Sequence, residues 1–289
     1  MTWRDRMEGM LNRRGTIAGA ALAAAGICAI LFAFASGSGA ASQSSLTVNL
    51  PPAATDRIYS APQARGRPIV VIDAGHGGRD PGARSVSGEA SEKDLTLALA
   101  RELRDDLVKR GRVRVAMTRD DDRYLTLDER AAVARRLNAA MFISLHMDSA
   151  PNPLARGASV YSLSDVASDP DAARFAALEN AGADIRDSGA SVGSILSDLA
   201  MRSQMSASAD LATRLVRKSA GRFELRPNPH RFAAFHVLRR SGTAAVLFEA
   251  GYVSNADDEL LLRSPEHRSQ IALALAQAIE ADVAAHSRR

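Results

Sequence analysis

The sequence predicts an α/β fold, a single domain in which a twisted, mostly parallel or mixed sheet is flanked by helices on both faces. From Pro68 onward, short apolar runs rich in β-branched residues alternate with longer amphipathic segments. This alternation is typical of a sheet covered by helices on both sides. The chain has 289 residues, 46% hydrophobic and 24% charged, so one large core can form.

The expected elements follow one another along the chain. Apolar runs predict the strands, and apolar residues spaced three or four positions apart predict the helices. The last helix is expected to begin near Pro265, because proline is favoured in a first turn. The strands are expected at 69–73, 113–117, 141–146, 157–162 and 244–249, and the helices at 92–110, 126–138, 170–187, 206–221 and 266–285.

Residues 1–40 differ in kind from the rest of the chain. Four arginines precede an apolar stretch at 17–35, and small residues follow it, which is the layout of an export signal. The adjacent pair Arg13-Arg14 also permits a twin-arginine signal, and a retained membrane anchor is the alternative. We expect cleavage near Ala40 and a working domain outside the cytoplasm.

Two further segments stand apart from the regular alternation. Residues 41–67 are rich in Ser, Ala, Pro and Thr without apolar periodicity, which predicts a linker. The domain is then expected to span 68–289, with an insertion at about 164–221 that has few large apolar residues. Long insertions without a core of their own are usually functional lids or disordered segments.

The composition excludes several kinds of site. The net charge is only +4 and no run of Lys and Arg is dense, so binding to nucleic acid is not expected. Cys28 is the only cysteine, which excludes an intramolecular disulfide and a cysteine-based zinc site. Any metal ion must therefore be held by His, Asp and Glu.

Two of the expected strands lead to a histidine. His76 follows the first strand between Gly75 and Gly77, and His146 ends the strand that begins at Met141. Ligands bind at the carboxyl ends of strands in α/β sheets, so the two imidazoles are candidate metal ligands. The glycine-rich loop alone could also be a phosphate-binding turn, but the lysine of a nucleotide site is missing.

Acidic residues could complete this site. Glu92 opens the helix expected at 92–110, where it is either a ligand or an ordinary first-turn carboxylate, and residue type does not decide between these. Glu249 ends the last strand, and because an unpartnered buried carboxylate is costly, a role as general base is favoured. Asp73 could orient His76, or it could only cap its strand.

Four segments resemble motifs of a known family, in the same order. The family is that of the zinc-dependent N-acetylmuramoyl-L-alanine amidases, which remodel bacterial cell walls, and the resemblance covers residues 68–289. The chain carries Asp148 where relatives often have Asn, and an acid there would raise the basicity of a neighbouring ligand. The segments are IDAGHGG (72–78), EKDL (92–95), SLHMD (144–148) and EAGYVSN (249–255).

The resemblance implies a ligand set and a reaction. His76, Glu92 and His146 are expected to bind one zinc ion, with Glu249 as the general base. The expected reaction is hydrolysis of the amide between N-acetylmuramic acid and the L-alanine of the stem peptide in peptidoglycan. The resemblance and the export signal together predict a periplasmic enzyme, expected to be a monomer.

The resemblance also suggests a role for the insertion. Relatives that act in cell division often carry a helix here that covers the zinc. Two acids of this chain, Asp165 and Glu179, could fill the open position of the ion, although both could be ordinary surface acids. Release would then require a partner, expected to be an envelope activator of the degenerate LytM type.

Two rival functions stay open. One is a different zinc hydrolase of the cell wall, such as a peptidase or a sugar deacetylase. The other is a silent wall-binding regulator, which would be expected to lack a ligand or the catalytic glutamate, whereas all four residues are present here. The other histidines, His230, His236, His267 and His286, are assigned no role.

Overall fold

The computed structural model describes residues 56–182 and 195–286. The expected export signal at 1–40 lies outside these residues and stays a prediction. In the described ranges, every helix is too short or too polar to cross a membrane.

The described strands form one mixed sheet, in the order β1-β3-β2-β4-β7-β5-β6. Neighbours among β3, β2, β4 and β7 run parallel, whereas β5 is antiparallel to β7 and β1 is antiparallel to β3. This confirms the predicted mixed sheet. The strands are β1 (Ile58–Tyr59), β2 (Ile69–Ala74), β3 (Arg114–Met117), β4 (Met141–Asp148), β5 (Ala158–Leu163), β6 (Leu225–Ala233) and β7 (Ala245–Tyr252).

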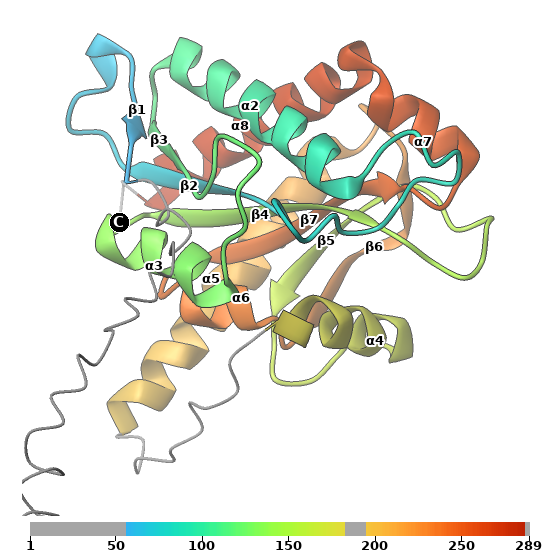
Figure 1. The fold of residues 1–289 in the computed structure, drawn as a ribbon. Helices are drawn as coiled ribbons and strands as arrows, with labels where there is room; N and C mark the ends of the chain where they lie inside the picture. The colour runs from blue at the N-terminus through green and yellow to red at the C-terminus, as the bar shows by residue number, and fades with distance from the viewer. Residues whose placement is uncertain (1–55, 183–194, 287–289) are drawn as a thin grey trace, which may run out of the picture. The chain divides into compact units, whose positions relative to one another are not determined.

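Helices cover both faces of this sheet (Figure 1). Helices α2 and α8 and the second half of α5 pack against one face, whereas α3, α4 and α6 pack against the other. The predicted two-sided cover is therefore confirmed. The helices are α2 (Glu92–Arg110), α3 (Leu127–Arg136), α4 (Pro170–Glu179), α5 (Ile195–Ser219), α6 (His236–Arg240), α7 (Ala256–Arg263) and α8 (Pro265–His286), with short 3-10 turns at Pro62–Ala64 and Asn180–Gly182.

Local sequence explains where the regular elements begin and end. Helix α2 ends at Gly111, which adopts a left-handed conformation with φ of 66°, as is common just after a helix. Helix α3 begins at a capping box, in which the Thr126 side chain accepts from the Glu129 N–H and Glu129 accepts from the Thr126 N–H. Strands β2, β4 and β7 are buried along their whole length, as strands covered on both faces must be.

The structure differs from the expected elements in several places. Strand β1 lies inside the segment 41–67 that was expected to be a linker, and two residues are too few for a periodic pattern. Strand β6 was missed because it contains Pro227 and Pro229, and it lies at the edge of the sheet, where proline is tolerated. Helix α6, which begins at His236, is also absent from the expected elements.

The insertion also packs more closely than its composition suggested. Helix α5 starts at Ile195, well before the expected residue 206. Leu211 and Leu215 in its second half are fully buried in the core that it shares with α2 and α8. The expected insertion at 164–221 is therefore partly built into the domain.

The register of the sheet places the candidate site. Strands β2, β4 and β7 run parallel, so their carboxyl ends meet at one edge, and His146 lies opposite Glu249. Side chains alternate along a strand, and Phe142 and Leu247 of the same strands pack toward α3, α4 and α6. His146 and Glu249 therefore share the face that α4 covers.

Candidate metal centre

The structure brings together the three ligands that the resemblance implied. Oε1 of Glu92 lies 3.1 Å from Nε2 of His76 and 3.1 Å from Nδ1 of His146. The two imidazole rings meet edge to face, with centroids 4.9 Å apart. Three side chains from distant parts of the sequence thus converge on one point.

Glycines allow this close approach. A Cβ atom at Gly75 would lie 2.6 Å from the His146 ring, and one at Gly82 would lie 2.6 Å from Oε2 of Glu92. Real Cβ atoms do not approach other groups so closely, so the loop that carries His76 requires glycine at positions 75 and 82. The glycines of this segment therefore have a steric role beside the imidazoles.

Backbone groups fix the Glu92 carboxylate, which is almost fully buried. The Met147 N–H donates to Oε1 at 3.0 Å, and the Ala83 N–H donates to Oε2 at 2.9 Å. Burial by itself would raise the pKa of Glu92, but the charge of His76 and the contacts of both imidazoles outweigh burial and lower this pKa. Glu92 is therefore a carboxylate held ready for a cation.

The interaction that lowers the pKa of Glu92 also raises the pKa of the His76 imidazole. Burial lowers the pKa of His76, but the carboxylates of Glu92, Asp80 and Glu179 outweigh it and raise this pKa to about 11. The cluster thus attracts positive charge strongly. A divalent cation would take the place of these protons, because metal ligands must be deprotonated.

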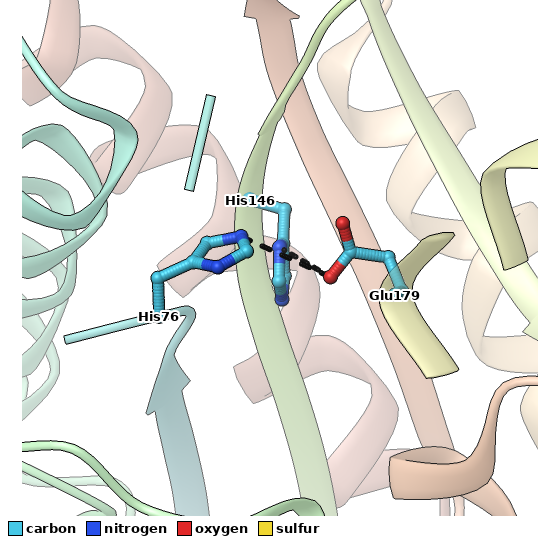
Figure 2. Close-up of side chains that lie close together, drawn as sticks. All are labelled: His76, His146 and Glu179. Carbon is cyan, nitrogen blue, oxygen red and sulfur yellow. Dashed lines mark ion pairs between the residues drawn. The ribbon is translucent and has the colours of Figure 1, made fainter. Parts of the chain in front are cut away.

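A fourth side chain, Glu179 at the end of α4, points into the cluster (Figure 2). Its Oε2 lies 3.3 Å from Nδ1 of His146 and 3.8 Å from Nε2 of His76. The structure therefore places Glu179, one of the two acids expected from the insertion, beside both histidines. Asp165 is instead 64% exposed and paired with Arg239, away from these residues.

The spacing of these atoms fits a zinc ion. Tetrahedral zinc with bonds of about 2.0–2.1 Å separates its ligand atoms by about 3.3 Å. The four contacts among the two imidazoles and two carboxylates are 3.1, 3.1, 3.3 and 3.8 Å. The buried Nε2 of His76 has no hydrogen-bond partner among the described residues. The donor atoms and their spacing therefore suit a small divalent cation.

Asp80 orients His76, a role that the sequence reading did not assign. Its Oδ2 lies 2.9 Å from Nδ1 of His76, and its Oδ1 accepts from the Gly82 N–H at 3.1 Å. A metal-binding histidine commonly donates its other ring N–H to a carboxylate. The available signal was an acid four residues after the histidine, in the same glycine-rich loop.

Asp73, in contrast, contacts other groups than the His76 ring. It accepts hydrogen bonds from Thr118 at 2.6 Å, Ser144 at 2.7 Å and Arg130 at 2.9 Å. The second amino group of Arg130 donates to the His76 carbonyl at 2.6 Å. Asp73 therefore acts on His76 through Arg130 and the backbone, and does not orient its imidazole as the sequence suggested.

Asp148 contacts neither ligand imidazole through any hydrogen bond between described residues. Its Oδ1 accepts from the Ser149 N–H at 2.7 Å, and it lies opposite Tyr252 in the register of β4 and β7. Burial raises the pKa of Asp148 to about 6. Its acidic side chain therefore forms part of the buried surroundings of the site and is not bonded to a ligand.

Glu249 lies beside the cluster without a partner. It is fully buried, and neither carboxylate oxygen has a hydrogen-bond partner among the described residues. Burial, followed by repulsion from Asp148 and Glu92, raises the pKa of Glu249 well above its ordinary value. Neighbouring strands are about 4.8 Å apart, so its place opposite His146 sets this carboxyl group next to the cluster.

The cluster opens into a cavity of about 450 Å³. Its lining includes His76 and Asp80 of the glycine-rich loop, Arg130 of α3, and Leu178 and Glu179 of α4. Histidines outside the cluster pair elsewhere: His230 with Ser162, and His236 with Asp128.

The chain is similar to known proteins of one family. The family described as N-acetylmuramoyl-L-alanine amidase matches residues 70–281. The N-acetylmuramoyl-L-alanine amidase AmiA of Escherichia coli is 32% identical over 234 residues, 78% of this chain and 80% of the relative. AmiC of Neisseria meningitidis serogroup B, of the same description, is 34% identical over 220 residues, 74% of this chain and 52% of the relative.

Solved structures agree with this assignment. The catalytic domain of CwlV, an N-acetylmuramoyl-L-alanine amidase from Bacillus (Paenibacillus) polymyxa, superposes with a TM-score of 0.57 and 28% identity. The superposition covers 73% of this chain and 96% of that domain. The family match over residues 70–281 includes the strands and helices that carry the cluster. This chain therefore belongs to the N-acetylmuramoyl-L-alanine amidase family.

Proposed function

We propose that this protein is a zinc-dependent hydrolase of peptidoglycan, which cleaves the amide between N-acetylmuramic acid and the L-alanine of the stem peptide. The observation that carries this proposal is the convergence of His76, Glu92 and His146 beside the unpartnered carboxyl group of Glu249. Membership of the family supports the bond that is cleaved.

The donor set supports zinc as the cofactor. Two imidazole nitrogens and one carboxylate leave one coordination position free, as in catalytic zinc sites. When bound, zinc would supply Lewis acidity toward the scissile carbonyl and toward the attacking water. Asp80 and Arg130 would keep the His76 imidazole and backbone in place through their contacts at 2.9 and 2.6 Å.

Glu249 would carry the proton through the reaction. Its carboxylate accepts a proton as the water oxygen attacks the amide carbon, and returns that proton to the nitrogen of L-alanine as the C–N bond breaks. The products are the lactyl carboxylate of the glycan and a stem peptide with a free amino group. A buried carboxyl group with a raised pKa suits both transfers.

The position of Glu179 supports an autoinhibited resting state. Its carboxylate, 3.3 Å from Nδ1 of His146, would occupy the coordination position that the reaction needs. Two contacts hold α4 in place: Arg231 binds Asp169 at its start, and Asn180 at its end donates to the Ala234 carbonyl at 2.8 Å. Activation would require α4 to leave the cluster.

Location and partners rest on the sequence and on the family resemblance. We infer export by residues 1–40, whether cleaved or retained, and action on peptidoglycan in the periplasm during cell division. Relief of autoinhibition would come from an envelope activator of the degenerate LytM type. The catalytic domain is proposed to work as a monomer.

Product analysis tests the proposed function against its rivals. Purified protein carrying Glu179→Ala, to remove the inhibitory carboxylate, is loaded with zinc and incubated with peptidoglycan. An amidase releases whole stem peptides that begin with a free L-alanine amine, detectable by mass spectrometry. New amines within the peptide would indicate a peptidase, new amines on the sugars would indicate a deacetylase, and no cleavage would favour a silent regulator.

A further inference from the structure

A second cavity lies beyond α4, at the same end of the sheet as the metal centre. It measures about 650 Å³, and it is lined by Asp148 and Tyr252 from β4 and β7 and by arginines from several other segments. Leu178 and Glu179 of α4 line the first cavity, and Arg174 of the same helix lines the second. Helix α4 therefore lies between the two cavities.

Two of the four arginines around this second cavity are neutralised by acids. Arg231 is buried and binds Asp169, and it donates to the Tyr161 hydroxyl at 2.9 Å. Arg156 binds Glu224 at 2.6 Å and Asp257 at 3.0 Å. Their charges are balanced within the protein, so they hold the walls of the cavity together.

The other two arginines form no ion pair with an acid in the described parts of the chain. Arg226, on β6, donates to the Tyr252 hydroxyl at 2.5 Å, and its guanidinium lies 5.8 Å from the centre of that ring. Arg174, on α4, lines the cavity from the rim. A guanidinium keeps most of its donors free when it binds one neutral hydroxyl. Arg226 therefore has guanidinium donors that no ion pair among the described residues occupies, and its charge acts on Asp148 in the wall of the same cavity.

The distance to the metal centre limits what can bind there. Asp148, on the cavity wall, follows His146 by two residues along β4, which is a separation of about 7 Å. An extended peptide covers this distance in about two residues. A substrate with its scissile amide at the metal centre would therefore bring the second residue of its peptide arm to this cavity, which Arg226 also lines.

We propose that this cavity is the binding site for the peptide arm of the substrate, and that Arg226 pairs with a carboxylate on its second residue. The proposal rests on the proposed amidase function. Arginine binds carboxylates through two parallel hydrogen bonds, whereas the glycan arm is neutral once its lactyl group is in the amide. Arg226 lies on the sheet and stays in place when α4 moves, so it is the anchor.

A binding experiment tests this assignment without requiring hydrolysis. The protein carries Glu179→Ala, which removes the carboxylate from the metal centre, and Glu249→Gln, so that substrate is not consumed; it is titrated by calorimetry with N-acetylmuramoyl-L-alanyl-D-glutamate and with the same compound bearing an α-amide. We expect the acid to bind about tenfold more tightly than the amide, because a charge-assisted pair replaces a neutral one. Adding Arg226→Ala should abolish this difference.

Matched variants separate charge recognition from a loss of structure. Arg156→Ala removes an arginine of the same cavity that already has acidic partners, and it should keep the preference for the acid. Arg226→Lys keeps the charge and should keep part of the preference, and thermal unfolding checks that each variant is folded. Equal affinity for acid and amide, or equal weakening of both by Arg226→Ala, would overturn the proposal.

The same experiment distinguishes this inference from the amidase proposal. If the Glu179→Ala protein cleaves neither compound but binds the acid in preference through Arg226, the cavity is still a carboxylate site and the proposed reaction is wrong. If both compounds are cleaved with equal KM and Arg226→Ala changes neither KM, the reaction stands and the role of Arg226 is wrong.

Discussion

Oε2 of Glu179 lies 3.3 Å from Nδ1 of His146, so a residue of α4 enters a cluster built by β2, α2 and β4. This contact ties a separate helix to the candidate reaction centre. The proposed autoinhibition depends on this contact, because the same carboxylate cannot stay there while a substrate carbonyl enters.

Removing the Glu179 carboxylate is expected to activate the protein. We expect Glu179→Ala to raise the basal rate of peptidoglycan hydrolysis by about tenfold or more, because a contact to a charged group contributes about 1.5–3 kcal/mol. The measurement is the release of dye-labelled fragments by zinc-loaded protein. Asp165→Ala, which changes an exposed acid of the same insertion, should leave the rate unchanged. A folded, zinc-loaded Glu179→Ala protein with the wild-type rate would rule out this inhibition.

Glu249→Gln is expected to abolish turnover while zinc remains bound. Loss of a general base typically lowers the rate by about 10²–10⁴-fold, and Glu249 is not among the proposed ligands. The hydrolysis rate of the Glu179→Ala protein is compared with that of the protein carrying both Glu179→Ala and Glu249→Gln. The zinc content of both proteins is measured by elemental analysis. Zinc loss in the variant would instead make Glu249 a ligand.

The free energy of unfolding of the metal-free protein should also depend on pH, because Glu249 titrates differently in the folded and unfolded states. Burial raises the pKa of folded Glu249 above the ordinary value of 4.5, so the folded state holds its proton more tightly than the unfolded state. Its stabilising effect is complete below about pH 4.5 and is lost as pH rises toward the raised pKa. Denaturant unfolding should therefore show that the advantage of Glu249→Gln over wild type grows with pH, and a constant difference would contradict this.

Asp80→Asn is expected to weaken metal binding without preventing folding. Loss of a carboxylate that orients a histidine ligand typically costs about 10–100-fold in metal affinity. The measurement is zinc affinity by competition with a chelator. Asp122→Asn is the control, because Asp122 binds the Gly78 N–H and Lys93 in the same region without contacting His76. Equal affinities in wild type and Asp80→Asn would remove Asp80 from the metal centre.

Asp73→Ala is expected to destabilise the fold by about 3–5 kcal/mol, because it leaves the buried Arg130 without its charge partner. Burial raises the pKa of Asp73, but Arg130 and the hydrogen bonds from Thr118 and Ser144 outweigh burial and lower it. Its contribution should therefore be present above about pH 4 and be lost as pH falls through the lowered pKa. Urea unfolding of wild type and Asp73→Ala at several pH values checks both the size and the direction, and an equal difference at all pH values would contradict the expected pH dependence.

Much of the scaffold could be predicted from local patterns. Helix α2 has the bounds that its apolar spacing indicated, His76 follows Gly75, the first residue after β2, and His146 lies in β4, two residues before the strand ends. These elements are long or fully buried, so the pattern of apolar residues in their sequences indicates which side chains face the core. Strand β6 was missed because its prolines indicate a loop, and only its place at the sheet edge makes them acceptable.

The choice among acidic residues could not be made in the same way. Residue type left Glu92 undecided between ligand and helix-start carboxylate, and only the family resemblance pointed to the ligand role. Asp165 and Glu179 were equal candidates in the insertion, and the packing of α4 placed Glu179 at the histidines while Asp165 paired with Arg239. Asp80, not Asp73, proved to contact the His76 ring.

By itself, the sequence determined the α/β class, the strands that end near His76, His146 and Glu249, and the absence of cysteine ligands, because periodicity and residue chemistry are local properties. The tertiary structure alone decided that Asp80 and Glu179 meet the imidazoles and that Arg226 lines a second cavity without forming an ion pair with any described acid. Those contacts join residues far apart in the chain, and their distances follow from how helices and strands pack, which no short stretch of sequence encodes.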